Sequence, residues 1–176
     1  LVEREELLRV ERTPLRYGRA RVDLGDYEWA LSDGDYTPGT ILMTEAYEAL
    51  VSQRWFEGLT ALCGELLEAA RTQFATEQAP EDGCFDVLDG GALDFTFWNV
   101  VRCPDGSLRS VDTKWTQKGG VPADYVLFRS LFFLLSAGSP FLSVSLRDTM
   151  RRLLQQFFPE FDDTRLDNHL ARERRL

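Results

Sequence analysis

The sequence predicts an α+β domain that is mainly helical and is organised around one central β-hairpin. Apolar residues at three-to-four spacing predict helices on both sides of a short segment in which β-prone runs flank a turn. The 176 residues are 44% hydrophobic and 12% aromatic, which is enough for one packed core. We therefore expect a single domain over residues 1–176, with a leader or remnant of a preceding segment at 1–18, short strands and a loop at 19–40, and a helical lobe at 41–176.

A pair of short strands is predicted in the N-terminal part. Apolar residues alternate between Arg19 and Leu31, and Gly25-Asp26 stands where a two-residue hairpin turn is expected. Residues 32–39 are dense in Ser, Asp, Gly, Thr and Pro, a composition that predicts a loop.

Two helical segments are predicted before the central hairpin. Helical periodicity begins near Thr44, whose hydroxyl suits an N-cap. The periodicity returns more strongly from Trp55 to Phe74, where apolar residues share one face. This second segment is predicted to be a long amphipathic helix, with Gly58 as the expected position of a break.

The hairpin itself is the most distinct local pattern. Residues 97–101 and 108–111 are β-prone and flank a Cys-Pro-Asp-Gly sequence at 103–106, in which Pro and Asp-Gly supply turn dihedral angles. Because a hairpin reverses the chain, residues just before its first strand and just after its second strand are expected at one edge.

Three further helices are predicted after the hairpin. The first covers residues 124–137 and is strongly apolar. The next opens at a capping box formed by Ser145 and Asp148 and ends before Pro159. The last begins near Thr164, close to the C-terminus.

Charge and cysteine content exclude several classes of protein. The formal net charge of -9 argues against nucleic acid and anionic membranes as partners. Three cysteines without a C-x-x-C spacing and one histidine, His169, predict neither a disulfide framework nor a zinc site. The most apolar stretch, 125–146, is interrupted by Arg129 and by a Gly-Ser-Pro sequence, so no membrane span is expected. We infer a reducing, cytoplasmic location.

Three polar residues around the hairpin have a spacing that suits metal-assisted phosphoryl transfer. Asp94 precedes the first strand, Asn99 lies within it, and Asp112 follows the second strand. Phosphoryl transfer from ATP needs a carboxylate that orients or deprotonates the acceptor hydroxyl, and oxygen ligands that hold magnesium against the phosphates. The hairpin is expected to bring the three side chains to one edge.

This spacing resembles the catalytic loop and metal-binding segment of protein-kinase-like folds, in which Asp-x-x-x-x-Asn, a hairpin and a second Asp follow one another. Residues 111–115 and 121–131, which read VDTKW and VPADYVLFRSL, look like a kinase-like region found in bacterial polysaccharide methyltransferases and glycosyltransferases. The Trp98-Asn99 pair also resembles a segment of the bifunctional methyltransferase-kinases that cap O-antigen chains. The narrower resemblance covers residues 34–135.

The resemblance implies the C-terminal lobe of a protein-kinase-like fold, with an N-terminal lobe that is absent or rudimentary. It implies Asp94 as the catalytic base and Asn99 and Asp112 as magnesium ligands, with Mg²⁺ and ATP as cofactors. The implied activity is phosphoryl transfer to a hydroxyl of a sugar or small molecule in bacterial surface-polysaccharide biosynthesis. The implied partners are the acceptor and other domains of a larger parent protein.

Several positions depart from the kinase pattern and leave a second function open. Ala92 stands where a histidine or its equivalent is expected, and Lys114 stands where the bacterial family usually has Glu. The only lysines are Lys114 and Lys118, which both follow the hairpin, so the sequence contains no strand lysine upstream of it. It also contains no glycine-rich loop upstream. The alternative is a catalytically inactive, pseudokinase-like module that binds or supports an attached methyltransferase or glycosyltransferase domain.

Four further polar and aromatic side chains are expected to have structural roles or to be solvated. Trp98 and Trp115 flank the candidate site, and aromatic residues in short strands are expected to fill the core. Arg129 interrupts an apolar helix, which predicts an internal ion pair, with a loop carboxylate as one candidate partner. His169 lies in a charged terminal helix and is expected to be solvated.

Overall fold

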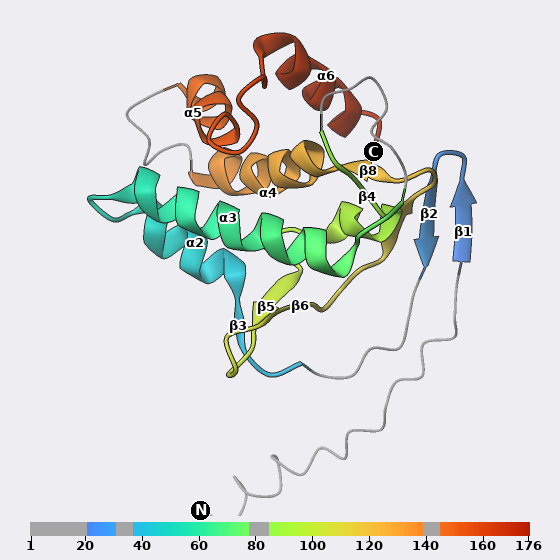
Figure 1. The fold of residues 1–176 in the computed structure, drawn as a ribbon, viewed down its shortest axis with the longest axis horizontal. Coiled ribbons are helices and arrows are strands. Elements are labelled where there is room, and N and C mark those ends of the chain that lie inside the picture. Colours follow the sequence, from blue (N-terminus) through green and yellow to red (C-terminus); the bar gives the residue numbers. More distant parts are fainter. Residues whose placement is uncertain (1–20, 31–36, 78–84, 139–144) are drawn as a thin grey trace, which may run out of the picture.

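A computed structural model describes residues 21–30, 37–77, 85–138 and 145–176, which form an α+β fold (Figure 1). About half of these residues are helical, and the rest of the regular structure consists of short strands. The expected leader at 1–18 and residues 32–36 of the expected loop lie outside the described residues.

The helices form layers around one central helix, α4. The described helices are α2 (Leu42–Leu50), α3 (Trp55–Gln73), α4 (Ala123–Gly138), α5 (Leu146–Leu154) and α6 (Asp163–Glu173). Helix α4 lies between the α2–α3 pair and the α5–α6 pair (Figure 1). Within the described ranges, none of these helices combines the length and apolar character that a membrane crossing requires.

The central position of α4 follows from its composition. Its apolar residues are not confined to one stripe, and a helix that is apolar all round must be covered on all sides. Tyr125, Phe128 and Leu131 are fully buried, and the helix also buries the polar side chains of Asp124 and Arg129. These two ionisable groups need partners inside the core, and both find them.

The strands form three small antiparallel sheets. The first contains β1 (Arg21–Leu24), β2 (Tyr27–Ala30) and β7 (Trp115–Gln117), the second contains β3 (Thr40–Ile41), β5 (Val100–Arg102) and β6 (Leu108–Ser110), and the third contains β4 (Val87–Leu88) and β8 (Val121–Pro122). A 3₁₀ helix, η2 (Gly90–Asp94), connects β4 with the segment that leads to β5. Each hairpin predicted from turn residues is therefore present, and the two hairpins extend into larger sheets through β7 and β3.

Two expectations about the first helices are wrong. Helix α2 begins at Leu42, so Thr44 is not its N-cap, and the Ile41 cap position makes no side-chain hydrogen bond. The chain enters the helix directly from β3, and the Met43 N–H donates to the Phe97 carbonyl at 2.9 Å, which satisfies one amide of the first turn. Gly58 does not break α3, which runs as one helix through this position, and a Cβ atom there would come close to Ala49 of α2.

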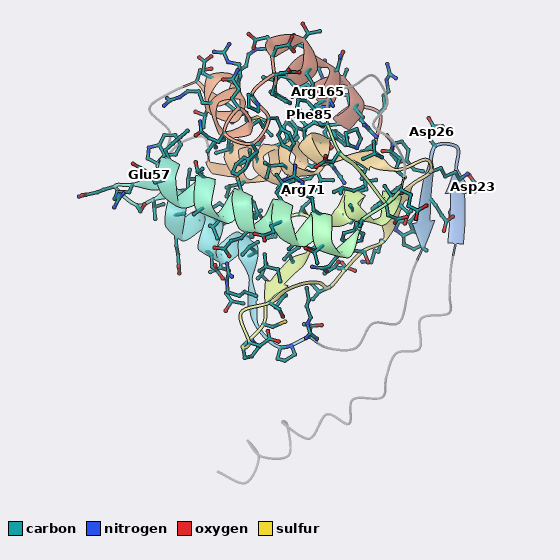
Figure 2. All side chains as sticks on the ribbon, viewed as in Figure 1. Asp23, Asp26, Glu57, Arg71, Phe85 and Arg165 are labelled. Carbon is teal, nitrogen blue, oxygen red and sulfur yellow. The ribbon has the colours of Figure 1, made fainter. Side chains whose placement is uncertain are left out.

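His169 is buried, which contradicts the expectation that it is solvated. It lies on the face of α6 that packs against α4, and its Nε2 is 2.8 Å from Oδ2 of the fully buried Asp124. Arg165, one turn earlier on α6, also pairs with Asp124 and stacks its guanidinium 4.4 Å from the ring centre of Phe85. Figure 2 shows Arg165 and Phe85 side by side at this contact.

Burial alone would raise the pKa of Asp124, but hydrogen bonds and positive charge from His169 and Arg165 outweigh it and lower this pKa. The carboxylate therefore joins two residues of α6 to α4.

Replacing Asp124 by Asn is expected to lower the free energy of unfolding by about 3 kcal/mol at neutral pH, because Arg165 and His169 lose a buried carboxylate. Since the pKa of Asp124 is lower in the folded chain than in the unfolded chain, its contribution is complete above the ordinary value of 3.8 and is lost as the pH falls through the folded pKa. Urea unfolding over an acid-to-neutral pH series measures both effects. The exposed Glu160→Gln variant serves as the control, and a difference between Asp124→Asn and wild type that stays constant into strong acid contradicts the assignment.

Candidate functional site

Asp94, Asn99 and Asp112 line one pocket of about 390 Å³. The remaining lining residues are Thr96, Trp98, Lys114, Trp115, Arg129 and Phe133. The pocket lies where η2, the turn before β5, the segment after β6 and one face of α4 meet. The structure therefore brings together the three side chains that the sequence spacing singled out.

Asp94 is a buried carboxylate that ties two distant segments of the chain. Its Oδ2 accepts hydrogen bonds from the backbone N–H groups of Lys114 at 2.9 Å and Trp115 at 2.8 Å. Its Oδ1 lies 3.5 Å from Nη1 of Arg129. Burial raises the pKa of Asp94, while the two backbone hydrogen bonds and the Arg129 charge partly offset that rise.

The position of Asp94 depends on a close approach between η2 and β7. A Cβ atom at Gly90 would overlap the carbonyl oxygen of Gln117, so a glycine is required at the start of η2. The Asp89 side chain accepts a hydrogen bond from the Gly91 N–H at 2.9 Å and caps this helix. As a result, Asp94 stands at the C-terminal end of η2, and not in an irregular loop as expected.

Asn99 lies in a turn directly before β5, and the expectation that it belongs to the strand is wrong. Its backbone N–H donates to the Thr96 carbonyl at 2.9 Å, and its carbonyl accepts the Val111 N–H at 2.8 Å. The first contact closes the turn, and the second joins this turn to the segment that leads to Asp112. The side chains of Asn99 and Asp112 thereby reach the same pocket.

Asp112 is exposed and is paired with Lys114. Both carboxylate oxygens of Asp112 lie 3.0 Å from the Lys114 ammonium nitrogen. The Lys114 backbone N–H is also one of the two donors to Asp94, so this residue contacts both carboxylates of the site. Lys114 supplies the positive charge next to Asp112 that a bound cation would otherwise supply.

Trp98 is exposed, which contradicts the expectation that it fills the core. Its side chain retains 49% exposure and lines the pocket. Trp115 is half-buried and packs against the core, as expected, and Phe133 of α4 contributes a third aromatic ring to the lining. The pocket thus combines aromatic surface with several hydrogen-bonding side chains, as small-molecule sites do.

Arg129 has the internal ion pair that the sequence predicted. Its guanidinium contacts Asp94, donates from Nη1 to the Leu93 carbonyl at 2.6 Å, and lies 2.6 Å through Nε from Oε1 of Glu173. The sequence did not identify Glu173, because nothing local distinguishes it from the other charged residues of the terminal helix. Ala92, at the position where a histidine or its equivalent is expected, is fully buried.

The pocket offers too few ligands to hold a metal ion by protein atoms alone, and its oxygen donors are of the type that magnesium prefers. In the part of the chain that the structure describes, no group of three or more His, Cys, Asp or Glu side chains is placed to hold a metal ion. Magnesium commonly uses one or two protein oxygen ligands and completes its coordination with water and phosphate oxygens. Asn99 and Asp112 can provide such a pair, in competition with Lys114 for the Asp112 carboxylate.

Comparison with known proteins gives no match to a protein-family model, to a curated protein or to a solved structure. The resemblance to a kinase-like lobe therefore remains a prediction that rests on the motif residues.

Replacing Asp94 by Ala is expected to lower the free energy of unfolding by about 3 kcal/mol, because two backbone N–H groups and Arg129 lose a buried acceptor. Asp112→Ala is the matched control in the same pocket. Its carboxylate is exposed and forms a surface pair, so the expected change is below about 1 kcal/mol. Urea unfolding of both variants measures the difference, and equal losses would show that Asp94 is not a structural anchor.

Proposed function

We propose that the pocket is the site of a kinase-like phosphotransferase that transfers the terminal phosphoryl group of ATP to a hydroxyl of a sugar or other small molecule. The observation that carries the proposal is that Asp94, Asn99 and Asp112 line one pocket together. Residues with this chemistry and this order along the chain suit acceptor activation by the first carboxylate and cation binding by the other two side chains.

Asp94 is suited to act as the acceptor-orienting base. Its Oδ2 is held by two backbone N–H groups, which fixes the carboxylate, while Oδ1 has hydrogen-bonding capacity beyond the 3.5 Å contact with Arg129. The raised pKa of Asp94 makes it a stronger base than an exposed carboxylate. In the proposed step the acceptor oxygen forms a bond to the γ-phosphorus, the bond to the ADP oxygen breaks, and Asp94 accepts the hydroxyl proton.

Asn99 and Asp112 are the proposed ligands of Mg²⁺. When bound, the ion neutralises phosphate charge that the protein's own residues leave uncompensated. Lys114 pairs with Asp112 in the absence of a metal and would compete with a bound cation for this carboxylate. Trp98 offers an exposed ring on which a nucleobase or a sugar can stack.

The wider context of this activity is proposed from the motif resemblance. The VDTKW and VPADYVLFRSL segments support a role in bacterial surface-polysaccharide biosynthesis, within a larger cytoplasmic protein that carries methyltransferase or glycosyltransferase domains. The acidic chain argues against nucleic acid as the acceptor.

A catalytically inactive module that binds an attached domain is the second candidate. Two observations favour it. The Lys114 ammonium already neutralises Asp112, as a metal would. In addition, the exposed apolar residues Ile41, Trp98 and Val111 lie on or beside the β3–β5–β6 sheet and give a partner domain apolar surface to contact.

Thermal shift with magnesium and ATP separates the two functions. A phosphotransferase pocket predicts an increase in melting temperature that needs both components and that is lost in Asp112→Asn, because ligand binding stabilises the folded state. Glu57→Gln is the matched control, since Glu57 is an exposed carboxylate at the far end of α3 (Figure 2). Lys114→Ala should enlarge the magnesium-dependent shift, because Asp112 no longer has a competing cation.

An unchanged melting temperature at every nucleotide and magnesium concentration, in wild type and in Lys114→Ala, contradicts the phosphotransferase proposal and favours the inactive module. A shift that survives in Asp112→Asn would place the ligand elsewhere on the chain.

Trp98→Ala is expected to weaken magnesium–ATP binding about tenfold, because stacking on an aromatic ring contributes roughly 1–3 kcal/mol per base. The side chain is about half exposed, so the stability of the folded chain should change little. Calorimetric titration measures the affinity, with the exposed Val51→Ala as a control for the loss of surface apolar area. Unchanged ATP affinity would show that Trp98 does not contact the nucleotide.

A further inference from the structure

A buried ion-pair network connects the pocket with the C-terminal helix. Glu173, the last residue of α6, lies with Oε1 2.6 Å from Arg129 Nε, and their side chains are only 9% and 11% exposed. The same Glu173 oxygen accepts a hydrogen bond from the Tyr125 hydroxyl at 2.7 Å. On its other side, the Arg129 guanidinium reaches Asp94 through Nη1 at 3.5 Å.

Arg129 thus stands between two carboxylates, and the two contacts differ in length. The contact with Glu173 is short at 2.6 Å, whereas the contact with Asp94 is long at 3.5 Å. The Nη1 atom that approaches Asp94 also donates to the Leu93 carbonyl at 2.6 Å. In a poorly solvated region, removing one of two carboxylates leaves the guanidinium charge less compensated, which strengthens its net attraction to the carboxylate that remains. The Glu173 carboxylate therefore limits how strongly Arg129 pulls on Asp94.

The orientation of Asp94 matters for the shape of the pocket. Its Oδ2 receives the Lys114 and Trp115 N–H groups, and these residues lead from Asp112 into β7. A carboxylate that rotated toward Arg129 would release these two amides. The segment that carries Asp112 and Lys114 would then lose its attachment to η2.

We propose that Glu173 is a positioning residue for the pocket: by holding Arg129, it keeps the Asp94 carboxylate on the Lys114 and Trp115 amides. Helix α6 is itself fixed on α4 by the pairs of Arg165 and His169 with Asp124. The C-terminal helix therefore controls a site formed by residues far from it in the sequence. The role of Glu173 in phosphoryl transfer rests on the proposed function, but its coupling to Asp94 does not.

Hydrogen exchange of individual amides in Glu173→Gln tests the coupling without any ligand. The Lys114 and Trp115 amides should exchange at least tenfold faster than in wild type, because Arg129 draws Asp94 away from them. The amides of the β5–β6 ladder should keep their rates, since the pairing of these two strands involves neither Arg129 nor Asp94. Tyr125→Phe is the matched control: it removes the hydroxyl hydrogen bond to Glu173 and leaves the ion pair with Arg129 intact.

Glu173→Asp provides a second variant, in which the charge stays but the reach is one methylene shorter, and a smaller acceleration at the same two amides is expected. Unchanged exchange at Lys114 and Trp115 in folded Glu173→Gln or Glu173→Asp overturns the proposal. Equal acceleration across the whole chain, or an equal effect in Tyr125→Phe, also overturns it, because the role of Glu173 would then be general stability.

Magnesium–ATP affinity of the same variants is a separate readout. Accelerated exchange together with a wild-type chain that binds no nucleotide would support the coupling while contradicting the proposed function. Nucleotide binding by wild type together with unchanged exchange would contradict the coupling and support the proposed function.

Discussion

The Asp94 carboxylate is the interaction on which the pocket depends. Two backbone N–H groups from the segment after β6 converge on one oxygen of a side chain at the end of η2. Without this attachment the segment that carries Asp112 and Lys114 would be joined to the turn before β5 mainly through the contact between the Val111 N–H and the Asn99 carbonyl. A buried charged acceptor is costly to desolvate, and here two backbone N–H groups and the Arg129 charge offset part of that cost.

Helix α4 lines the pocket through Arg129 and Phe133 and links it to the C-terminal part of the chain. Its two buried ionisable residues, Asp124 and Arg129, each pair with α6. These pairs are surrounded by apolar packing, so they contribute orientation more than net stability, because desolvation offsets most of the attraction within a buried pair. The core of the helical layers and the geometry of the pocket are therefore joined through the same helix.

The sequence predicted the elements that local chemistry determines. The Cys-Pro-Asp-Gly turn specifies the central hairpin, and the position of Asp112 after β6 follows from it. The apolar surroundings of Arg129 predicted an ion pair, because a buried guanidinium needs a partner.

Features that depend on distant contacts could not be predicted in this way. The pairing of Trp29 with Trp115 between β2 and β7 has no local signal, and neither does the contact between Arg129 and Glu173. The environments that the sequence predicts for Trp98 and His169 are wrong, because residue type and neighbouring charge do not reveal which face of an element is covered. The paired state of Asp112 likewise depends on where the Lys114 side chain lies in the folded chain.

Paramagnetic broadening by Mn²⁺ tests most directly the proposal that Asn99 and Asp112 bind one cation, because manganese shares the oxygen-ligand preference of magnesium. If the two side chains share a cation, low Mn²⁺ concentrations selectively broaden the amide resonances of Asn99 and residues 111–113, and excess Mg²⁺ restores them. Broadening that is absent, or that is spread evenly over exposed acidic segments such as residues 160–163, would contradict this proposal.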